Sequence, residues 1–237
     1  YRERLIRLPG TGACTRLPIA APEPLSPELR ALIDRAQGPR YIVCHTEFKH
    51  DPSHDDLYPR IAARTGRCRF FVLISMLQGR RLADRLVGRL RAAFARRGLE
   101  PDDHLEFVPW QPVGRFYSLL DEMDVYLDCP AFSGYTTAWQ AVHRGLPIVT
   151  LEGEFMRQRL AAGILRQIGC AQTIASTAEE YVRIAAETAL DSLEAAKREQ
   201  HRARIRAATA KLNDNVVVLW RFWQVLFDEL SGRTHGG

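Results

Sequence analysis

The 237-residue sequence has no charge-free run of 18 or more apolar residues, so it predicts no membrane-spanning helix. Its first residue is Tyr1 and no signal-peptide apolar run follows, so we expect the natural chain to begin earlier. The five cysteines form no C-x-x-C pair and are odd in number, which argues against a disulfide framework and a zinc cluster. These absences predict a folded cytoplasmic protein.

Most short motifs that identify enzyme classes are also absent. There is no G-x-S-x-G, H-E-x-x-H, Walker A or G-x-G-x-x-G sequence, which argues against the commonest hydrolases, zinc proteases, NTPases and dinucleotide-binding proteins. No D-x-D pair is present to hold a metal against a sugar-nucleotide diphosphate. The sequence Pro-Gly-Thr-Gly at 9–12 lacks the rest of a phosphate loop and predicts a turn or connector. His45, His50 and His54 are poorly spaced for a metal site, and we expect no bound metal or other cofactor.

The positive charge is concentrated in one segment. Between Arg60 and Arg97 the sequence has eleven arginines and a single acid, Asp84, within a formal net charge of +5. Such a segment is either a nucleic-acid surface or the solvated face of an arginine-rich helix. Because no aromatic residue is interleaved over 82–93, the solvated face is favoured and no nucleic-acid partner is predicted.

The middle of the chain alternates short β-branched runs with amphipathic segments, which predicts an α/β fold. We expect an open parallel Rossmann-like sheet with helices on both faces, and 46% apolar residues supply its core. The predicted strands are 41–44, 69–74, 105–108, 125–127 and 148–150. The predicted helices are 55–65, 81–97, 113–121, 136–144, 155–168, 178–190, 192–208 and 213–230.

The two ends of the chain differ from this middle part. Five prolines break any long element in the first 38 residues, so 1–38 is predicted to be a connector, 39–190 the α/β domain and 191–237 C-terminal helices. The last predicted helix has an apolar stripe containing Trp220 and Trp223, and further apolar residues on its other faces. That helix is either wedged into this domain's core or crosses to a second lobe.

Three strand ends carry the candidate chemistry, because ligands of open parallel sheets bind at the carboxyl ends of strands. Lys49 follows the first strand, where it is either solvated or placed to meet a phosphate. A strand, a small-residue turn and a helix start follow one another over 127–139, which predicts an anion site at the helix amides, although Ser133 or Thr136 can equally be a cap. Arg159, after a later strand, either reaches a ligand or pairs with an acid such as Glu154.

Three sets of motifs together resemble protein O-GlcNAc transferases. They are Glu-Phe-Lys-His-Asp-Pro at 47–52, the stretch 128–137 from Asp-Cys-Pro to Gly-Tyr-Thr-Thr, and Gly-Leu-Pro-Ile-Val-Thr-Leu-Glu-Gly-Glu at 145–154 with 159–162 and 169–170. They occur in the family's order and at similar spacing, and the resemblance covers residues 4–181. It implies the second, C-terminal Rossmann-like lobe of a GT-B fold, with a UDP-sugar bound between two lobes. In that fold 1–38 would be the interlobe connector and 39–190 the nucleotide-sugar-binding domain.

The resemblance also implies roles for individual residues. Lys49 is implied as the catalytic residue that contacts the diphosphate, where a fixed lysine and helix-end amides can neutralise charge in place of a metal. Where the family has histidine and aspartate, this chain has Tyr135 and Gln140, and Val113 and Phe116 replace the family's lysine and histidine near uracil. Phe116 can still stack on a base. The implied nucleotide-sugar site consists of Thr46, Gln111, Phe116, Gly134, Tyr135, Thr136, Thr137, Gln140 and Arg159.

The predicted function is therefore an inverting, metal-independent transfer of GlcNAc or glucose from a UDP-sugar to protein side chains. The expected partners are the UDP-sugar, a protein acceptor, and the N-terminal lobe and possible tetratricopeptide repeats of the same natural chain, so this fragment is expected to be inactive alone. One alternative is a bacterial glycan or adhesin glucosyltransferase. A second is a degenerate lobe that acts as a binding or scaffold module.

Overall fold

The computed structural model describes residues 6, 8, 10–12, 14, 20–75, 79–212 and 215–231. Its centre is a six-stranded parallel sheet with the order β3-β2-β1-β4-β5-β6. The strands consist mainly of apolar residues that are buried on both faces, as expected when helices cover the two sides of a parallel sheet. They are β1 (Arg40–Val43), β2 (Arg69–Ile74), β3 (Leu105–Pro109), β4 (Val125–Leu127), β5 (Ile148–Leu151) and β6 (Ile174–Ala175).

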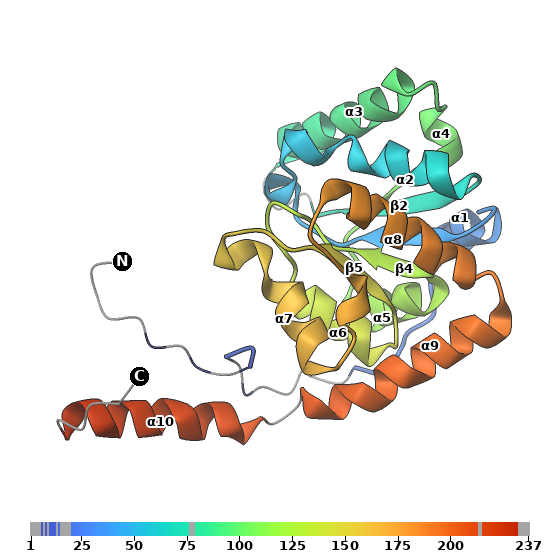
Figure 1. Ribbon diagram of the computed structural model, residues 1–237. Helices are drawn as coiled ribbons and strands as arrows, with labels where there is room; N and C mark the ends of the chain where they lie inside the picture. The colour runs from blue at the N-terminus through green and yellow to red at the C-terminus, as the bar shows by residue number, and fades with distance from the viewer. Residues whose placement is uncertain are drawn as a thin grey trace.

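Two hydrophobic cores lie on the two faces of the sheet, and helices cover both faces (Figure 1). Successive strand residues point to opposite faces, so that Tyr41 and Val43 enter one core while Ile42 enters the other. The Tyr41 face is covered by α2 (Leu57–Thr65), α3 (Arg80–Arg96) and α8 (Ala178–Asp191). The Ile42 face is covered by α1 (Pro27–Asp34), α5 (Val113–Glu122), α6 (Thr136–His143), α7 (Leu160–Gln167) and α9 (Ala195–Ala208), and the short α4 (Pro101–His104) precedes β3.

The predicted fold class is confirmed, and besides the short, unpredicted α4 it differs from the prediction in three places. β6 was not predicted, because two residues are too few to give a periodic signal. The predicted helix 155–168 is divided into a 3-10 turn (Met156–Gln158) and α7. The first 38 residues contain α1, which starts at Pro27 with Ser26 as its cap, because proline is well tolerated in the first turn of a helix.

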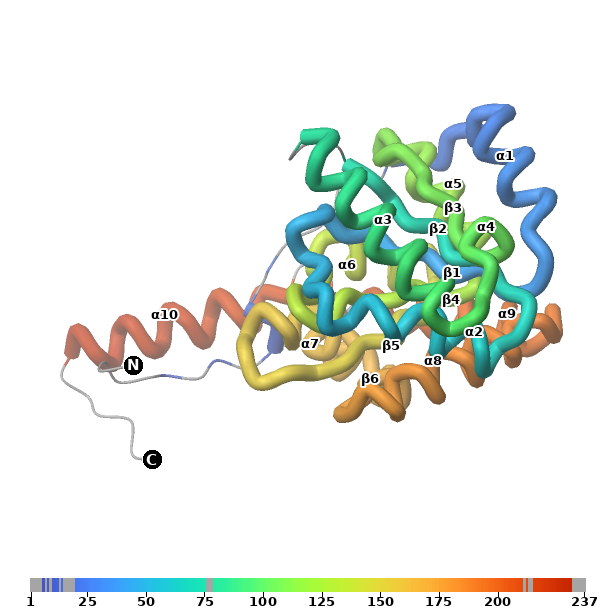
Figure 2. Tube along the Cα trace, turned by 90° about the horizontal axis from the view of Figure 1, so that it is seen from above, coloured from blue at the N-terminus to red at the C-terminus, as the bar shows by residue number. Residues whose placement is uncertain are grey.

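The C-terminal helix α10 (Val216–Leu230) extends away from the rest of the fold (Figures 1 and 2). Val218 is its one buried residue, whereas Trp220 and Trp223 are 67% and 64% exposed. The alternative that this helix is wedged into the domain's own core is therefore wrong, and a crossing to a second lobe remains a prediction. The predicted first two residues of the helix, 213 and 214, lie outside the described residues, as does Pro9 of the 9–12 turn.

Acidic residues pair with most of the arginines in the arginine-rich segment. In the described part of the chain seven of its eleven arginines form ion pairs, six of them with acids from other elements, such as Arg89 with Asp55 at 2.8 Å, and one, Arg80, with Asp84 of its own helix. This pairing favours the solvated helix face over a nucleic-acid surface. No helix in the described part of the chain is long and apolar enough to cross a membrane.

Candidate functional site

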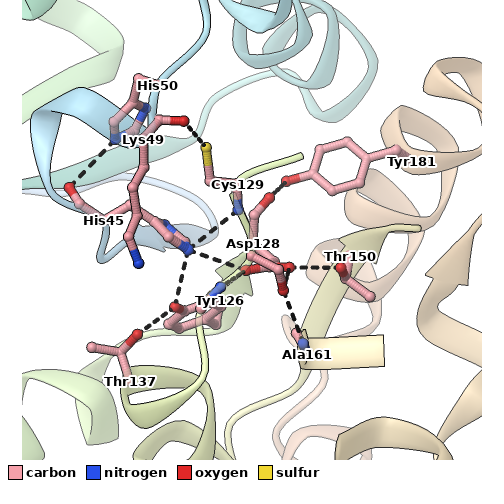
Figure 3. Close-up of polar contacts among 12 residues, drawn as sticks. His45, Lys49, His50, Tyr126, Asp128, Cys129, Thr137, Thr150, Ala161 and Tyr181 are labelled. Atoms are coloured by element: carbon pink, nitrogen blue, oxygen red, sulfur yellow. Dashed lines mark hydrogen bonds and ion pairs between the residues drawn. The ribbon is translucent and has the colours of Figure 1, made fainter. Parts of the chain in front are cut away.

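The carboxyl ends of β1 and β4 bring two polar loops together (Figure 3). The two strands are neighbours, with Tyr41 opposite Val125 in the register, so the residues that follow them meet at one edge of the sheet. The first loop carries His45 and Lys49, and the second leads from Asp128 into α6. This is the edge at which open parallel sheets bind ligands.

Asp128 organises the second loop although it is only 1% exposed. Its Oδ2 accepts hydrogen bonds from Ser133 Oγ and Thr150 Oγ1, both at 2.6 Å, and its Oδ1 accepts one from Gly134 N at 2.7 Å. Ser133 Oγ in turn accepts a hydrogen bond from Ala161 N, in the first turn of α7, at 2.8 Å. The carboxylate therefore joins the loop before α6 to β5 and α7.

The amino end of α6 has no side-chain cap. Tyr135 occupies the cap position without a capping hydrogen bond, and the Ser133 hydroxyl is committed to Asp128. The alternative in which Ser133 or Thr136 caps this helix is therefore wrong. The first amides of α6 remain available to an anion, which the positive end of the helix dipole also favours.

Two polar atoms of the first loop are buried without a hydrogen-bond partner in the described structure. They are His45 Nδ1 and Thr46 Oγ1. Burial of an unpaired polar atom costs about 1–3 kcal/mol, so two such atoms on adjacent residues are typical of a site that a ligand completes. Near the start of α6, burial raises the pKa of Tyr135, which a contact with the Thr11 hydroxyl partly opposes.

His45 links Asp128 to the start of α6 through Tyr126. Its Nε2 lies 3.1 Å from Asp128 Oδ1 and 3.4 Å from the Tyr126 hydroxyl. That hydroxyl lies 2.8 Å from Thr137 Oγ1. The Thr137 hydroxyl, predicted to contact the ligand, therefore belongs to a buried hydrogen-bond network that fixes its position, as Figure 3 shows.

Lys49 lies on a loop that is held at several points. Glu47 accepts hydrogen bonds from Ser75 N at 2.7 Å and from Ser75 Oγ at 2.6 Å, and Cys129 Sγ donates to the Lys49 carbonyl at 3.0 Å. Lys49 Nζ lies 4.4 Å from the centroid of the Phe132 ring. Burial is the main cause of a lowered Lys49 pKa, which the negative charge of the nearby Asp128 partly opposes.

The Lys49 ammonium has no acidic partner within ion-pairing distance in the described part of the chain. Lys197, by contrast, lies 2.8 Å from Glu194 and 3.4 Å from Asp191. A partly desolvated, unpaired cation next to uncapped helix amides is suited to binding a diphosphate.

Gly134 is required by the close packing of this network. A Cβ added to it would lie 2.6 Å from the Tyr126 hydroxyl and 3.0 Å from Thr137 Oγ1. These separations are too short for a side chain, so the backbone can approach the site here only as glycine. Thr136 is exposed in the first turn of α6, and Gln140 is half-buried one turn later.

Two predicted site residues make their described contacts within the fold. Arg159 Nε forms an ion pair with Glu152 at 2.9 Å. Of the two alternatives for Arg159, the structure therefore shows pairing with an acid, and that acid is Glu152 instead of Glu154. Phe116 is only 4% exposed and lies in the core, where α5 places it together with Leu119 and Leu120. The expectation that Phe116 stacks on a base is therefore wrong.

Gln111 lies at the end of β3, and its Nε2 donates to the Pro109 carbonyl at 2.6 Å. The aromatic residue exposed at this end is Trp110, which the sequence analysis did not single out. His45, Tyr126 and Asp128 were also missed as site residues. The one available signal was an acid at the end of a short apolar strand, because a buried carboxylate must find several donors.

The three histidines do not converge on a metal site. The rings of His45 and His50 are 6.1 Å apart and perpendicular, and His50 Nε2 lies 3.4 Å from the His45 carbonyl. Burial, with a smaller contribution from His45, lowers the pKa of His50 to about 3. In the part of the chain that the structure describes, no three His, Cys, Asp or Glu residues are grouped to hold a metal ion.

Comparison with known proteins agrees with this geometry. The model of Glycosyl transferase family 41 matches residues 115–216, which include α6 and its preceding loop. A Caenorhabditis elegans UDP-N-acetylglucosamine–peptide N-acetylglucosaminyltransferase is 28% identical over 145 residues, which are 61% of this chain and 12% of that protein. A solved O-GlcNAc transferase mutant of Thermobaculum terrenum is 27% identical with a TM-score of 0.68, over 92% of this chain and 41% of its own. The chain resembles the C-terminal lobe of O-GlcNAc transferase-like GT-B glycosyltransferases.

The predicted resemblance is thus confirmed, and the fold is shared more widely. An E. coli structure, trehalose-6-phosphate bound with UDP-2-fluoro glucose, has a TM-score of 0.59 at 16% identity, over 86% of this chain and 48% of its own. This likeness concerns the fold alone. The chain spans about a tenth of the C. elegans protein and less than half of the T. terrenum and E. coli chains. Within this O-GlcNAc transferase-like lobe, the family match covers the Asp128 loop, whereas Lys49 lies before it.

Proposed function

We propose that this chain is the donor-binding lobe of an inverting, metal-independent glycosyltransferase that transfers GlcNAc or glucose from a UDP-sugar to protein side chains. One observation carries the proposal. The unpaired Lys49 ammonium and the uncapped amides of α6 lie on adjoining loops at the carboxyl edge of the sheet. Together they supply one full and one partial positive charge to a diphosphate.

The reaction requires most stabilisation where charge develops. As the bond between the sugar and the UDP oxygen breaks, the leaving diphosphate gains negative charge, which Lys49 and the α6 amides are placed to neutralise. In an inverting displacement the acceptor hydroxyl attacks the opposite face of the sugar carbon, and a base takes its proton. We assign this base to the acceptor side, on a second lobe, so the present chain alone is expected to be inactive.

The relatives support the donor class. The C. elegans and T. terrenum proteins carry names that refer to N-acetylglucosamine transfer. UDP-GlcNAc and UDP-glucose share the UDP group that Lys49 and α6 would bind. UDP binding is therefore the property to test first, before the choice between GlcNAc and glucose.

The test is titration calorimetry of UDP without metal into the parent chain, Lys49→Met and Lys197→Met. Methionine is unbranched and only one atom shorter than lysine, and it removes the charge; Lys197 is an exposed lysine on α9. We expect Lys49→Met to lose about 1.5–3 kcal/mol of binding energy, roughly 10- to 150-fold in Kd. Lys197→Met should bind like the parent. Equal binding by the parent and Lys49→Met would refute the assignment of Lys49.

A degenerate lobe that serves as a binding or scaffold module is the second candidate. It is favoured by the burial of Phe116 and by Tyr135 and Gln140 at positions where the family has other residues. This candidate predicts a stable fold whose melting temperature does not rise with UDP. A concentration-dependent rise in melting temperature, as mass action requires for a ligand of the native state, would exclude it.

A further inference from the structure

Trp110 is held at the same edge of the sheet as Lys49. Its backbone N–H donates to the Ile74 carbonyl at 2.9 Å, which continues the β2–β3 pairing by one residue. Ser75, which follows Ile74 at the end of β2, donates hydrogen bonds to Glu47 in the Lys49 loop. Two hydrogen-bonded steps therefore connect Trp110 to the proposed diphosphate site.

The Trp110 side chain is a braced aromatic surface. Its indole lies nearly parallel to the buried Phe116 ring, at an angle of 14° and a centroid distance of 6.3 Å, and Trp110 remains 40% exposed. Phe48 and Phe155 are also exposed near this edge, but Phe48 has no ring contact among the described residues and Phe155 stacks against Arg157 at 4.4 Å. Trp110 is thus best prepared to receive another flat group at little cost in conformational entropy.

β3 lies at a distance from the Lys49 loop that the base of a nucleoside diphosphate can reach. β3 is two strands from β1, a separation of about 10 Å at the usual strand spacing. A nucleotide whose diphosphate lies at Lys49 and α6 can therefore extend its base toward β3. We infer that the exposed face of Trp110 stacks on the base of the nucleotide donor, an inference that rests on the proposed function.

If Trp110 is such a stacking platform for the base, its replacement should change the affinity for UDP but not the affinity for pyrophosphate, which has the two phosphates without the base. UDP and inorganic pyrophosphate are titrated without metal into the parent, Trp110→Ala, Trp110→Phe and Lys49→Met. Trp110→Ala should weaken UDP roughly 5- to 150-fold, the range that aromatic stacking on a base supplies, and leave pyrophosphate unchanged. Trp110→Phe should retain most of the UDP affinity, and Lys49→Met should lower the affinity for both UDP and pyrophosphate.

Fluorescence gives a second measurement. The parent's tryptophan emission should be quenched by UDP but not by pyrophosphate. Trp110→Phe should lose that response while retaining the other three tryptophans, Trp139, Trp220 and Trp223. Trp110→Phe keeps an aromatic ring over Phe116, so the loss of UDP quenching in this variant tests the inference if Trp110→Ala does not fold.

The outcomes separate the platform from the proposed function. If the parent binds neither pyrophosphate nor UDP, the proposed function fails and the platform fails with it. If the parent binds both ligands equally tightly, or if Trp110→Ala binds UDP like the parent, the donor site stands and the platform alone is refuted. An equal loss of both ligands in Trp110→Ala also overturns it, because a general loosening of the edge would then explain the result.

Discussion

Replacement of Asp128 by asparagine should destabilise the whole sheet edge. The carboxylate accepts hydrogen bonds from Ser133 Oγ, Thr150 Oγ1 and Gly134 N, and Asp128 is 1% exposed. A hydrogen bond to a charged group contributes about 1.5–3 kcal/mol and a neutral one about 0.5–1.5 kcal/mol. Three contacts that each lose roughly 1 kcal/mol give a destabilisation of about 3 kcal/mol. For a domain of this size that corresponds to a fall in Tm of about 6–12 °C.

The shape of asparagine makes this a test of charge more than of packing. Its Oδ1 can still accept from Gly134 N, and its amide can donate to the Thr150 hydroxyl, so most of the volume and connectivity is preserved. Alanine at position 128 would instead leave the O–H donors of Ser133 and Thr150 without an acceptor in a buried site, and it should cost more than asparagine.

Thermal unfolding followed by circular dichroism measures the effect against two comparison variants. Asp103→Asn changes an exposed aspartate that makes no ion pair in the described structure, so it should stay within about 0.5 kcal/mol of the parent. Thr150→Val removes one donor and should cost about 1–2 kcal/mol. A fall in Tm of less than about 2 °C for Asp128→Asn would refute the argument that the buried charge holds these loops together.

Two further predictions concern the same edge. Gly134→Ala places a methyl group 2.6 Å from the Tyr126 hydroxyl, so the loop before α6 must shift; calorimetry should show a loss of UDP affinity of at least tenfold, and an unchanged Kd would contradict the packing argument. Glu152 has its pKa lowered to about 2, first by its hydrogen bond from Arg166 and then by Arg159. Because the folded pKa is depressed, this stabilisation is present above the ordinary value of 4.5 and is lost as pH falls from there toward 2. Glu152→Gln should therefore reduce the acid-induced fall in Tm over that range, and parallel pH profiles for the two chains would show that the pair contributes nothing.

The fold could be predicted from the sequence because its strands are strong local signals. The segment 69–74 is a continuous apolar run, and a parallel sheet buried on both faces requires such a run. β6 escaped prediction because it has two residues and depends on pairing with β5. α1 was missed because the prolines around it suggested a connector, whereas Pro27 in fact begins the helix.

The sequence could predict only those parts of the site that directly follow strands. Lys49 and the start of α6 follow strands, so the topology of the sheet brings them to one edge. The Asp128 network combines partners far apart in the chain, with His45 83 residues away, and local patterns contain no such pairing. Phe116 was misassigned although a helical signal existed, since it shares a helix face with Leu119 and Leu120.

A lysine at position 49 is unusual in a chain whose basic residues are nearly all arginines. The sequence has thirty arginines and only three lysines, and arginine supplies most of the described ion pairs. Lysine carries a compact charge whose pKa responds to burial, whereas arginine stays charged in a rigid fork suited to carboxylates. An arginine on this loop would be drawn toward the carboxylate of Asp128, which already holds the loop before α6. Lysine over the Phe132 ring keeps its charge near that loop without an acid, so the first strong anionic partner it meets can be the ligand.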